Sequence, residues 1–596
     1  MNTYKNRKEV PEQEQWNLQD IYADEAAWQK DYESAEGKIK EISKYNDNIT
    51  NAKSLLAYLT LSEEIERVYT KLSGYSMLSL DIDTREGAPQ KLVDKTRQLG
   101  QKWSSATSFF MPYLLSLESE ELKQYIAEEE GLKYFEKDLL ESFSYKKHVL
   151  SKEQEEIMAQ MGEAISAPSR IFGMINNADI KFGTVTNDNG EKIELTRGMY
   201  AKLIEDEDRE KRKEAYKAYY EPYVTLKNTI ATTFGSAVKN NVKLSKIRNY
   251  PSALEKSLFA DRVPKEVYEN LIEATRKNLT YMSDYMEYRK NKLGLESLHA
   301  YDLGVPLVAE ASKEKISYEN AYELMLEALK PLGEEYIEIL KSFKEKRYLD
   351  VRETPGKRSG AYNLGLYGVH PFILLNHRDD LDSLFTLAHE CGHGMHSYYS
   401  STYQPQITAG YSIFVAEVAS TVNEVLLIRY LLSKETDSAK KEHLVNHFID
   451  SFKGTFFTQV MFSEFEKTVH EKAEAGEALT LDLFNEIYEE LFIAYNGKQL
   501  VVDEEVKYGW SRIPHFYRPF YVYKYATGFA SAITIADKLL SGDAVAKENY
   551  LQFLKSGSSD FPLELLKKAG VDLTTPEPID HAMSIFHSLI KEVMEK

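Results

Sequence analysis

Apolar and charged residues follow each other along most of the chain at the spacing of amphipathic helices. Apolar and aromatic positions recur every three to four residues among Glu and Lys, and this period predicts α-helices. The pattern is clearest in four stretches: 62–80, 118–135, 205–220 and 318–330. The last stretch should end near Pro331 and Gly333, because neither residue continues a helix well. We therefore predict a mainly α protein.

Two segments have the shorter period of β-strands. Residues 179–196 alternate apolar and polar positions around the dipeptide Asn189-Gly190, which is typical of a hairpin turn. Residues 352–377 begin with turn-forming residues and end in an apolar run, just before a helix that should begin near Asp380. We expect a hairpin in the first segment and one or two strands in the second.

The length and composition predict a large globular protein with more than one part. The chain has 596 residues, of which 43% are hydrophobic, and this is enough material for a sizeable core. No repeat of fixed period and no low-complexity tract is present. We place the domain boundary at the predicted hairpin, so that a helical N-terminal domain, 1–190, precedes a second domain, 191–596.

The charge balance and the single cysteine narrow the class of protein. The 74 Lys and Arg against 94 Asp and Glu leave a formal net charge of −20, which argues against nucleic acid or an anionic membrane as the main partner. Cys391 is the only cysteine, so a reducing compartment fits. Residues 1–20 lack the apolar core of a signal peptide, and charges interrupt the most apolar stretch, 412–432. We expect a cytoplasmic protein, and no interface signature indicates its oligomeric state.

The segment His389-Glu390-Cys391-Gly392-His393 is an H-E-x-x-H motif. Positions i and i+4 of a helix lie on one face, so the two imidazoles can bind one metal ion. Glu390 is offset by one residue and can therefore act as a general base on a water molecule at the metal. The motif predicts a helical metal site with catalytic chemistry.

Two other features bear on this motif. His443 and His447 have the same spacing but no Glu after the first histidine, so we expect this second pair to lie on a partly buried helix face. Gly392 and Gly394 each cost a helix interior about 1 kcal/mol relative to Ala. We expect these glycines to allow a very close approach by another element, such as a second helix that carries a metal ligand.

Two histidines leave a catalytic zinc ion short of one protein ligand. The histidine that metzincins place further along the motif is absent, because the chain has Tyr399 at that position. A carboxylate on the next predicted helix, 412–432, is the remaining source, and Glu417 and Glu424 lie there on one polar stripe. The spacing alone does not choose between these two acids.

Two longer runs surround the motif residues: GKRSGAYNLGLYGVHPFILLNHRDDLDSLFTLAHECGHGMHSYY, 356–399, and YSIFVAEVASTVNE, 411–424. In these runs the chain resembles the thimet oligopeptidase family of zinc peptidases. WNLQDIY, 16–22, together with Trp28 also resembles the start of family members, so the similarity spans most of the chain. It implies a large two-part helical clamshell around a deep channel, with a small β-sheet beside the metal-binding helix.

The resemblance also assigns roles at the motif. His389 and His393 match the zinc histidines of the family, Glu390 matches the general base, and Glu417 matches the third ligand. It thus implies one zinc ion per chain and selects Glu417 where spacing left the choice open. His396 matches an additional family histidine.

Further roles follow from the same resemblance. Glu424 matches an acid that orients a ligand histidine. In the tyrosine-rich segment 512–529, His515 matches a histidine that faces the zinc and binds the substrate carbonyl. Tyr521 and Tyr525 reproduce a family Tyr-x-x-x-Tyr spacing after a shift of one residue. Which tyrosine donates to the oxyanion stays open, and at least half of the tyrosines here should only pack.

The segment 372–376 allows two interpretations. In the family a comparable segment pairs with the extended backbone of the substrate, as an added strand would. The alternative is an ordinary buried strand. The residues do not favour either interpretation over the other.

The leading hypothesis is a zinc endopeptidase that acts on short oligopeptides. A zinc carboxypeptidase or dipeptidyl carboxypeptidase could use the same ligands, but it needs a cation for the substrate's C-terminal carboxylate, and the sequence does not identify one. A catalytically silent helical binding protein is the third hypothesis. The intact motif with Glu390 argues against it.

Overall fold

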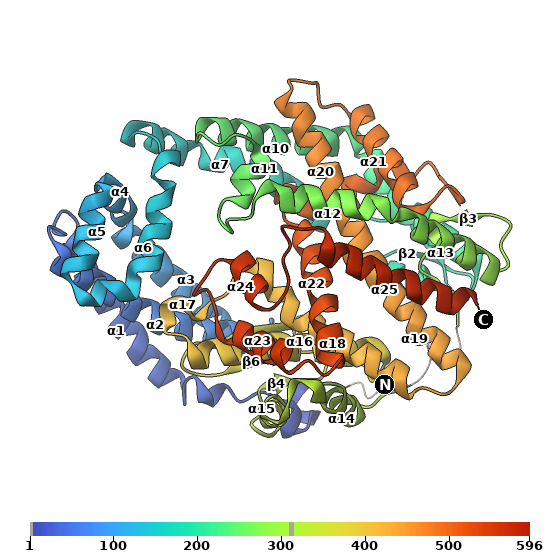
Figure 1. The fold of residues 1–596 in the computed structure, drawn as a ribbon, viewed down its shortest axis with the longest axis horizontal. Helices are drawn as coiled ribbons and strands as arrows, with labels where there is room; N and C mark the ends of the chain where they lie inside the picture. Colours follow the sequence, from blue (N-terminus) through green and yellow to red (C-terminus); the bar gives the residue numbers. More distant parts are fainter. Residues whose placement is uncertain (1–3, 188, 309–314, 596) are drawn as a thin grey trace. The chain divides into compact units, whose positions relative to one another are not determined.

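The computed structural model describes residues 4–187, 189–308 and 315–595. Within them the chain forms the helices α1 to α25 and only short strands (Figure 1). The mainly α class predicted from the periodicity is confirmed. No helix in the described ranges combines the length and the apolar character needed to cross a membrane.

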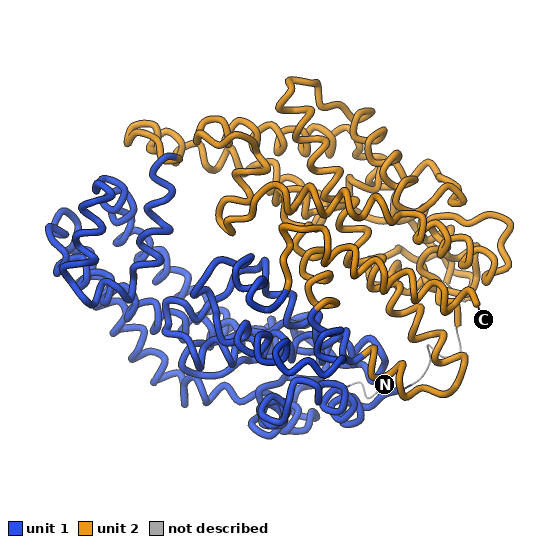
Figure 2. Tube along the Cα trace, viewed as in Figure 1, with its two compact units in different colours: residues 1–147, 315–427, 535–570 blue, residues 148–314, 428–534, 571–596 orange. Residues whose placement is uncertain are grey.

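The chain divides into two compact units, and each is assembled from three segments (Figure 2). Unit 1 comprises residues 1–147, 315–427 and 535–570, and unit 2 comprises residues 148–314, 428–534 and 571–596. Helices α18 (Ile413–Lys434) and α22 (Tyr523–Leu540) each continue from one unit into the other. The domain boundary that we placed near residue 190 stays a prediction.

The other helices of unit 1 come from all three of its segments. They are α1 (Glu25–Ile42), α2 (Ala52–Ile82), α3 (Gly87–Thr107), α4 (Phe110–Ser116), α5 (Ser119–Glu128), α6 (Glu136–Phe143), α14 (Tyr318–Ala328), α15 (Glu334–Glu345), α16 (Leu381–Tyr403), α17 (Gln406–Ala409), α23 (Ala544–Lys555) and α24 (Pro562–Lys568). Helices α1, α2 and α3 pack side by side (Figure 1). Trp28 of α1 is fully buried there, and its indole Nε1 donates to the carbonyl of Leu72 at 3.1 Å.

Unit 2 is also built almost entirely from helices. They are α7 (Lys152–Met174), α8 (Arg197–Leu203), α9 (Arg209–Thr225), α10 (Lys227–Ile247), α11 (Ala253–Leu258), α12 (Lys265–Lys277), α13 (Leu279–Lys292), α19 (Ser438–Ser451), α20 (Thr458–Glu474), α21 (Leu481–Asn496) and α25 (Glu577–Met594). The predicted hairpin is confirmed as β1 (Thr184–Thr186) and β2 (Lys192–Glu194), which pair antiparallel. Strands β3 (Leu298–His299) and β7 (Leu500–Val501) form a second short pair.

The four predicted helical stretches are helical in the structure. Residues 62–80 lie within α2, and 205–220 lie mostly within α9. Residues 118–135 form α5 and a following 3-10 helix, and 318–330 form α14. Helix α14 ends at Ala328, just before the proline and glycine that were expected to stop it.

A three-stranded sheet lies beside α16 in unit 1. Its order is β4 (Leu349–Asp350), β6 (Pro371–Leu374) and β5 (Tyr362–Gly365), with β6 parallel to β4 and antiparallel to β5. All residues of β6 are buried. Both sides of β6 already pair with strands. Of the two interpretations of 372–376, the ordinary buried strand is therefore confirmed, and pairing of this segment with a substrate is excluded. In the described part of this sheet, β5 is an edge strand.

Candidate metal site and active site

Helix α16 carries the H-E-x-x-H motif and begins where its sequence predicts. The carboxylate of Asp380 accepts a hydrogen bond from the backbone N–H of Ser383 at 2.9 Å and so caps the helix. The helix packs against the sheet through glycines. A Cβ at Gly394 would lie 3.0 Å from a side-chain carbon of Ile373 in β6, and a Cβ at Gly365 of β5 would lie 2.8 Å from Ser397.

Gly392 allows α16 and α18 to meet backbone to backbone. A Cβ at this position would lie 2.6 Å from the Cα of Ser420 and 2.7 Å from the carbonyl oxygen of Ala419. The side chain of Asn423 on α18 also donates to the carbonyl of Ala388 on α16 at 3.1 Å. The expectation that a second helix approaches the motif closely is therefore confirmed.

This approach places three candidate ligands together. Within the described residues, His389, His393 and Glu417 are the group of His, Cys, Asp and Glu side chains that could hold a metal ion, and their ligand atoms all lie within 4.8 Å of one another. The Nε2 atoms of His389 and His393 lie 3.5 Å and 3.8 Å from Oε2 of Glu417. Two imidazole nitrogens and one carboxylate oxygen are the donor set typical of catalytic zinc.

Glu424 contacts the other nitrogen of His389. Its Oε1 lies 2.9 Å from Nδ1 of the imidazole, so Nε2 is the nitrogen that faces Glu417. Burial lowers the pKa of His389, but the charge and hydrogen bond of Glu424 outweigh it and raise the pKa to about 9. A divalent cation at the site would instead favour the neutral imidazole. The two acids left open by spacing thus occupy different places around one ring.

Glu390 is buried and one of its carboxylate oxygens is unsatisfied. The side chain is 7% exposed, and Oε2 has no hydrogen-bond partner within the described residues. Burial raises the pKa of Glu390 to about 7, and the nearby charges of Glu417 and Glu424 add to the shift. A carboxylate that gains and loses a proton near neutral pH suits general acid–base chemistry. Burial also raises the pKa of the adjacent Cys391 thiol, so this cysteine is a poor nucleophile.

His396 is not one of the three candidate ligands. It is 1% exposed, and its ring stacks on Tyr411 with the centroids 3.7 Å apart and the planes 7° apart. Burial lowers the pKa of His396 to about 3, so the ring is neutral. The structure therefore favours a packing role for His396 beside the motif.

A hydrogen-bond chain that sequence reasoning missed links β5 to the motif. Asn363 Nδ2 donates to Ser397 Oγ at 3.0 Å, and Ser397 Oγ lies 2.8 Å from the hydroxyl of Tyr411. The same hydroxyl approaches the carbonyl of His393 at 3.4 Å. Its members come from a strand, a helix and a loop, so no local spacing could have indicated it.

His515, Tyr521 and Tyr525 lie together in unit 2. The rings of His515 and Tyr521 are parallel with centroids 6.1 Å apart, and the rings of Tyr521 and Tyr525 are 5.5 Å apart. The Tyr525 hydroxyl lies 3.4 Å from that of Tyr521. Burial, together with the charge of Arg518, lowers the pKa of His515, so its ring is neutral at neutral pH. The three residues thus form one cluster of polar aromatic side chains.

The neighbouring tyrosines pack, as half of them were expected to. Tyr523 is fully buried with its ring 5.1 Å from that of Tyr268, and the Tyr517 ring stacks on Phe172 at 4.4 Å. Phe520 has a positive φ of 54°, and its N–H donates to the buried carboxylate of Glu466 at 3.1 Å. Glu466 therefore holds the backbone just before Tyr521, and nothing in the sequence pattern marks it.

Two cavities flank the edge strand β5. One of about 320 Å³ is lined by Asn363, Gly365, Ser397 and Tyr411 among others, and one of about 270 Å³ is lined by Gly360, Ala361, Ser383 and Thr386 among others. Along α16 the motif lies between Thr386 and Ser397. The two cavities thus offer space toward the two ends of the motif, along the direction of α16.

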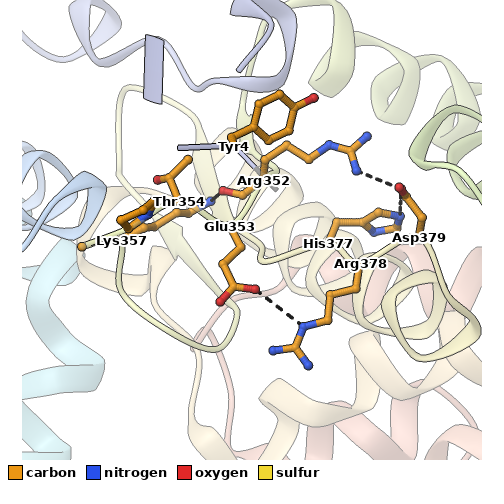
Figure 3. A pocket seen from close by; sticks show the side chains of 10 residues that line it. Tyr4, Arg352, Glu353, Thr354, Lys357, His377, Arg378 and Asp379 are labelled. Atoms are coloured by element: carbon orange, nitrogen blue, oxygen red, sulfur yellow. Dashed lines mark hydrogen bonds and ion pairs between the residues drawn. The ribbon is translucent and has the colours of Figure 1, made fainter. Parts of the chain in front are cut away.

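A third cavity, of about 360 Å³, lies beside the start of α16 (Figure 3). Its charged side chains are paired: Arg352 contacts Asp379 at 2.8 Å, and Arg378 contacts Glu353 at 3.7 Å. Asp379 also lies 3.6 Å from the buried ring of His377. None of the predicted site residues lines this cavity, and its ion pairs hold the turn that leads into α16.

The fold and this cluster define a helical metallopeptidase, and comparison with known proteins identifies the family. The model for "Peptidase family M3" matches residues 202–585, and the model described as "Oligopeptidase F" matches residues 114–182. The chain belongs to peptidase family M3. The resemblance stated from the motif is confirmed, and the chain is an enzyme, a metallo-oligopeptidase.

Relatives cover the whole chain. Oligopeptidase PepF of Bacillus subtilis (strain 168) is 41% identical over 595 residues, which are 100% of this chain and 89% of that protein. "Oligoendopeptidase F, plasmid" of Lactococcus lactis subsp. cremoris is 38% identical and covers 99% of this chain and 98% of its own length.

Solved structures agree in fold. The crystal structure of a putative peptidase from Chlamydophila abortus superposes with a TM-score of 0.90 at 33% identity, covering 99% of each chain. That of oligoendopeptidase-F from Enterococcus faecium gives a TM-score of 0.75 at 36% identity, covering 96% of this chain and 99% of the other.

Proposed function

We propose that this chain is a zinc-dependent endopeptidase that hydrolyses internal peptide bonds of short oligopeptides. One observation carries the proposal: His389, His393 and Glu417 present two nitrogens and one oxygen within 4.8 Å of one another. The unpartnered carboxylate oxygen of Glu390, on the residue next to His389, supports it. The names of the relatives, oligopeptidase and oligoendopeptidase F, support the substrate class.

His389, His393 and Glu417 would hold the zinc ion. Three protein ligands leave a fourth position open, as in catalytic zinc sites. When bound, zinc supplies Lewis-acid chemistry, because it polarises the scissile carbonyl and lowers the pKa of a water molecule. Glu424 accepts from Nδ1 of His389 and keeps Nε2 turned toward Glu417, which is how an acid beside a metal site orients a ligand histidine.

Glu390 handles the proton of the reaction. Its Oε2 takes a proton from the attacking water molecule and later gives this proton to the leaving amine. Burial of the side chain at 7% exposure limits competition from bulk water for this oxygen. No covalent acyl-enzyme is needed, because the attacking group is water.

The edge strand β5 would bind the substrate backbone. Its outer side has no strand partner within the described residues, and an extended peptide can add to such an edge through main-chain hydrogen bonds. The cavities lined by Ser383 and Thr386 and by Ser397 and Tyr411 would receive substrate side chains. Recognition carried by the main chain tolerates many peptide sequences.

The cluster of His515, Tyr521 and Tyr525 is our candidate for the hydrogen-bond donors that stabilise the tetrahedral oxyanion. Preorganised donors of this kind typically contribute a factor of about 10²–10³ to the turnover rate. Support comes from their mutual contacts, with ring centroids 5.5–6.3 Å apart. Glu466 fixes the backbone of this segment, because its carboxylate accepts a hydrogen bond from the N–H of Phe520.

The decisive experiment uses Glu390→Gln and a peptide blocked at both ends with a fluorophore and a quencher. We expect turnover to fall by about 10²–10⁴-fold, the usual contribution of a general base, while bound zinc measured by atomic absorption stays at one per chain. Glu338→Gln, which removes an exposed carboxylate of the same unit, is the matched control and should behave as wild type.

Three outcomes would count against the proposal. Unchanged turnover in Glu390→Gln would remove Glu390 as the base. A fully active enzyme that contains another metal in place of zinc would exclude zinc as the catalytic metal. An intact blocked peptide alongside cleavage of unblocked peptides would indicate a carboxypeptidase or dipeptidyl carboxypeptidase instead of an endopeptidase.

A further inference from the structure

Arg512 of unit 2 lies among tyrosine side chains from several helices. It is the last residue of the 3-10 helix Val506–Arg512 and is half-buried. Its Nε donates to the hydroxyl of Tyr220 at 3.0 Å, and its Cζ lies 5.9 Å from the centre of that ring. Tyr200 of α8 and Tyr488 of α21 also interact electrostatically with its guanidinium group.

The guanidinium group of Arg512 has no anion beside it. In the described part of the chain no carboxylate lies within ion-pair distance, and the bond to Tyr220 is its only hydrogen bond. By contrast, the buried Arg212 of the same unit contacts Asp302 at 2.8 Å. Charges withdrawn from water are normally paired in this way. Within the described residues, the two η nitrogens of Arg512 therefore lack such a partner.

Three tyrosine hydroxyls near Arg512 are also unused. Those of Tyr200, Tyr216 and Tyr488 make no hydrogen bond within the described residues, although the Tyr216 and Tyr488 side chains are only 5% and 3% exposed. None of these three hydroxyl oxygens is completely buried, so solvent still reaches them. Burial raises the pKa of each tyrosine, so all three are neutral donors.

Gly509 shows that Tyr488 approaches the face that carries Arg512. A Cβ at Gly509 would lie 2.7 Å from the Tyr488 hydroxyl oxygen. In a 3-10 helix, side chains three residues apart eclipse each other, so position 509 points in the same direction as position 512. A side chain at Gly509 would therefore push the Tyr488 hydroxyl away from the guanidinium group.

We infer that Arg512 and the hydroxyls of Tyr200, Tyr216 and Tyr488 form a binding site for a carboxylate. The free fork of a guanidinium group matches the two oxygens of a carboxylate. One positive charge among neutral phenols balances a single negative charge, which fits a carboxylate better than a phosphate dianion. Resting on the proposed function, the ligand is a peptide carboxylate, either the free C-terminus or an acidic side chain, and it adds affinity without being required for cleavage.

The test measures peptide binding by calorimetry in the Glu390→Gln background, where turnover does not interfere. Three N-acetylated hexapeptides of Gly and Ala are compared: a free acid, its C-terminal amide, and an amide with Glu as last residue. We expect the free acid to bind about ten- to a hundredfold more tightly than the plain amide, as a charge-assisted hydrogen-bond pair allows. Tight binding of the Glu-containing amide would identify a side-chain carboxylate as a second source of the ligand.

Arg512→Gln should lower the affinity for the free acid to that for the amide and leave the amide unchanged. Arg276→Gln, which removes an arginine paired with Glu464 in the same unit, is the matched control and should keep the difference. Tyr200→Phe and Tyr488→Phe each remove one hydroxyl, and each should cost the acid about three- to tenfold. These two variants test the site even where Arg512→Gln does not fold.

Equal binding of acid and amide by the Glu390→Gln protein would overturn the inference. So would an Arg512→Gln variant that weakens both peptides alike. Failure of the proposed function is distinguishable, because a chain that cleaves no peptide can still be titrated with N-acetylglycine and N-acetylglycinamide. The inference then predicts thermal stabilisation by the acid alone, which disappears in Arg512→Gln, and equal effects of both compounds would contradict it.

Discussion

Two helices of this chain carry histidines at positions i and i+4, and they have different surroundings. On α16, His389 and His393 face Glu417 at 3.5 Å and 3.8 Å. On α19, His443 and His447 are half-buried on a helix whose neighbouring apolar residues are in the core. Within the described residues the second pair belongs to no group of three potential ligands.

Because the two pairs share one spacing, the spacing of histidines alone does not make a candidate metal site, and the opposing helix decides the outcome. Helix α16 has glycine at position 392, so α18 approaches to within 2.6 Å of where a Cβ would be. That approach brings Glu417 to one nitrogen of His389 and Glu424 to the other. Helix α19 contains no glycine between its histidines, and the residues between them are mostly buried apolar side chains.

The first prediction concerns the loss of Glu417, the acid that faces the histidine pair of α16. Glu417→Gln replaces the charged candidate ligand by a neutral amide, so we expect metal affinity to fall by more than the factor of about 10–100 that the loss of an outer hydrogen bond costs. Competition with a chromophoric chelator measures this, with Glu338→Gln as control. Wild-type affinity in Glu417→Gln would mean that the third ligand lies elsewhere.

The second prediction concerns Gly392, the residue that allows α16 and α18 to approach each other closely. Gly392→Ala would place a methyl group against the backbone of Ser420 and Ala419, and overpacking of this kind typically costs about 1–3 kcal/mol. We expect a lower thermal midpoint and weaker metal binding together. Gly37→Ala on α1 is the matched control, because nothing lies within 4 Å of its added Cβ, and it should be neutral or slightly stabilising. Equal behaviour of the two variants would refute the packing argument.

The third prediction addresses the second acid on α18. Glu424→Gln keeps a hydrogen-bonding side chain beside Nδ1 of His389 but removes its charge, so we expect metal affinity to fall about 10–100-fold. Loss of metal as complete as in Glu417→Gln would contradict the distinction between the two acids. A calorimetric zinc titration of both variants, side by side, makes the comparison.

Features coded by local spacing could be predicted from the sequence. The start of α16 follows from Asp380, and the closeness of α18 follows from a glycine inside the motif at position 392. Local spacing could not choose between Glu417 and Glu424, because both lie on one stripe of α18. The family resemblance made that choice, and the structure separates the two acids by the nitrogen of His389 that each one faces.

Features that depend on distant segments could not be predicted in the same way. The apolar run 372–375 indicated a strand, but its central place follows from pairing with β4 and β5, which no property of the run encodes. The chain from Asn363 through Ser397 to Tyr411 joins three elements. Arg512 can be recognised as part of a candidate binding site only in the folded chain, because the sequence does not show which side chains surround its guanidinium group.

The last prediction concerns the second histidine pair and expects no effect on metal. His443→Gln and His447→Gln together should change zinc content and peptide turnover by less than about twofold, because within the described residues they belong to no group of three potential ligands. Atomic absorption and the blocked peptide measure both quantities. A variant that loses zinc would show that the second pair contributes a ligand. An unchanged variant would leave the acids of α18 as the feature that makes one histidine pair a candidate metal site and leaves the other as part of a helix face.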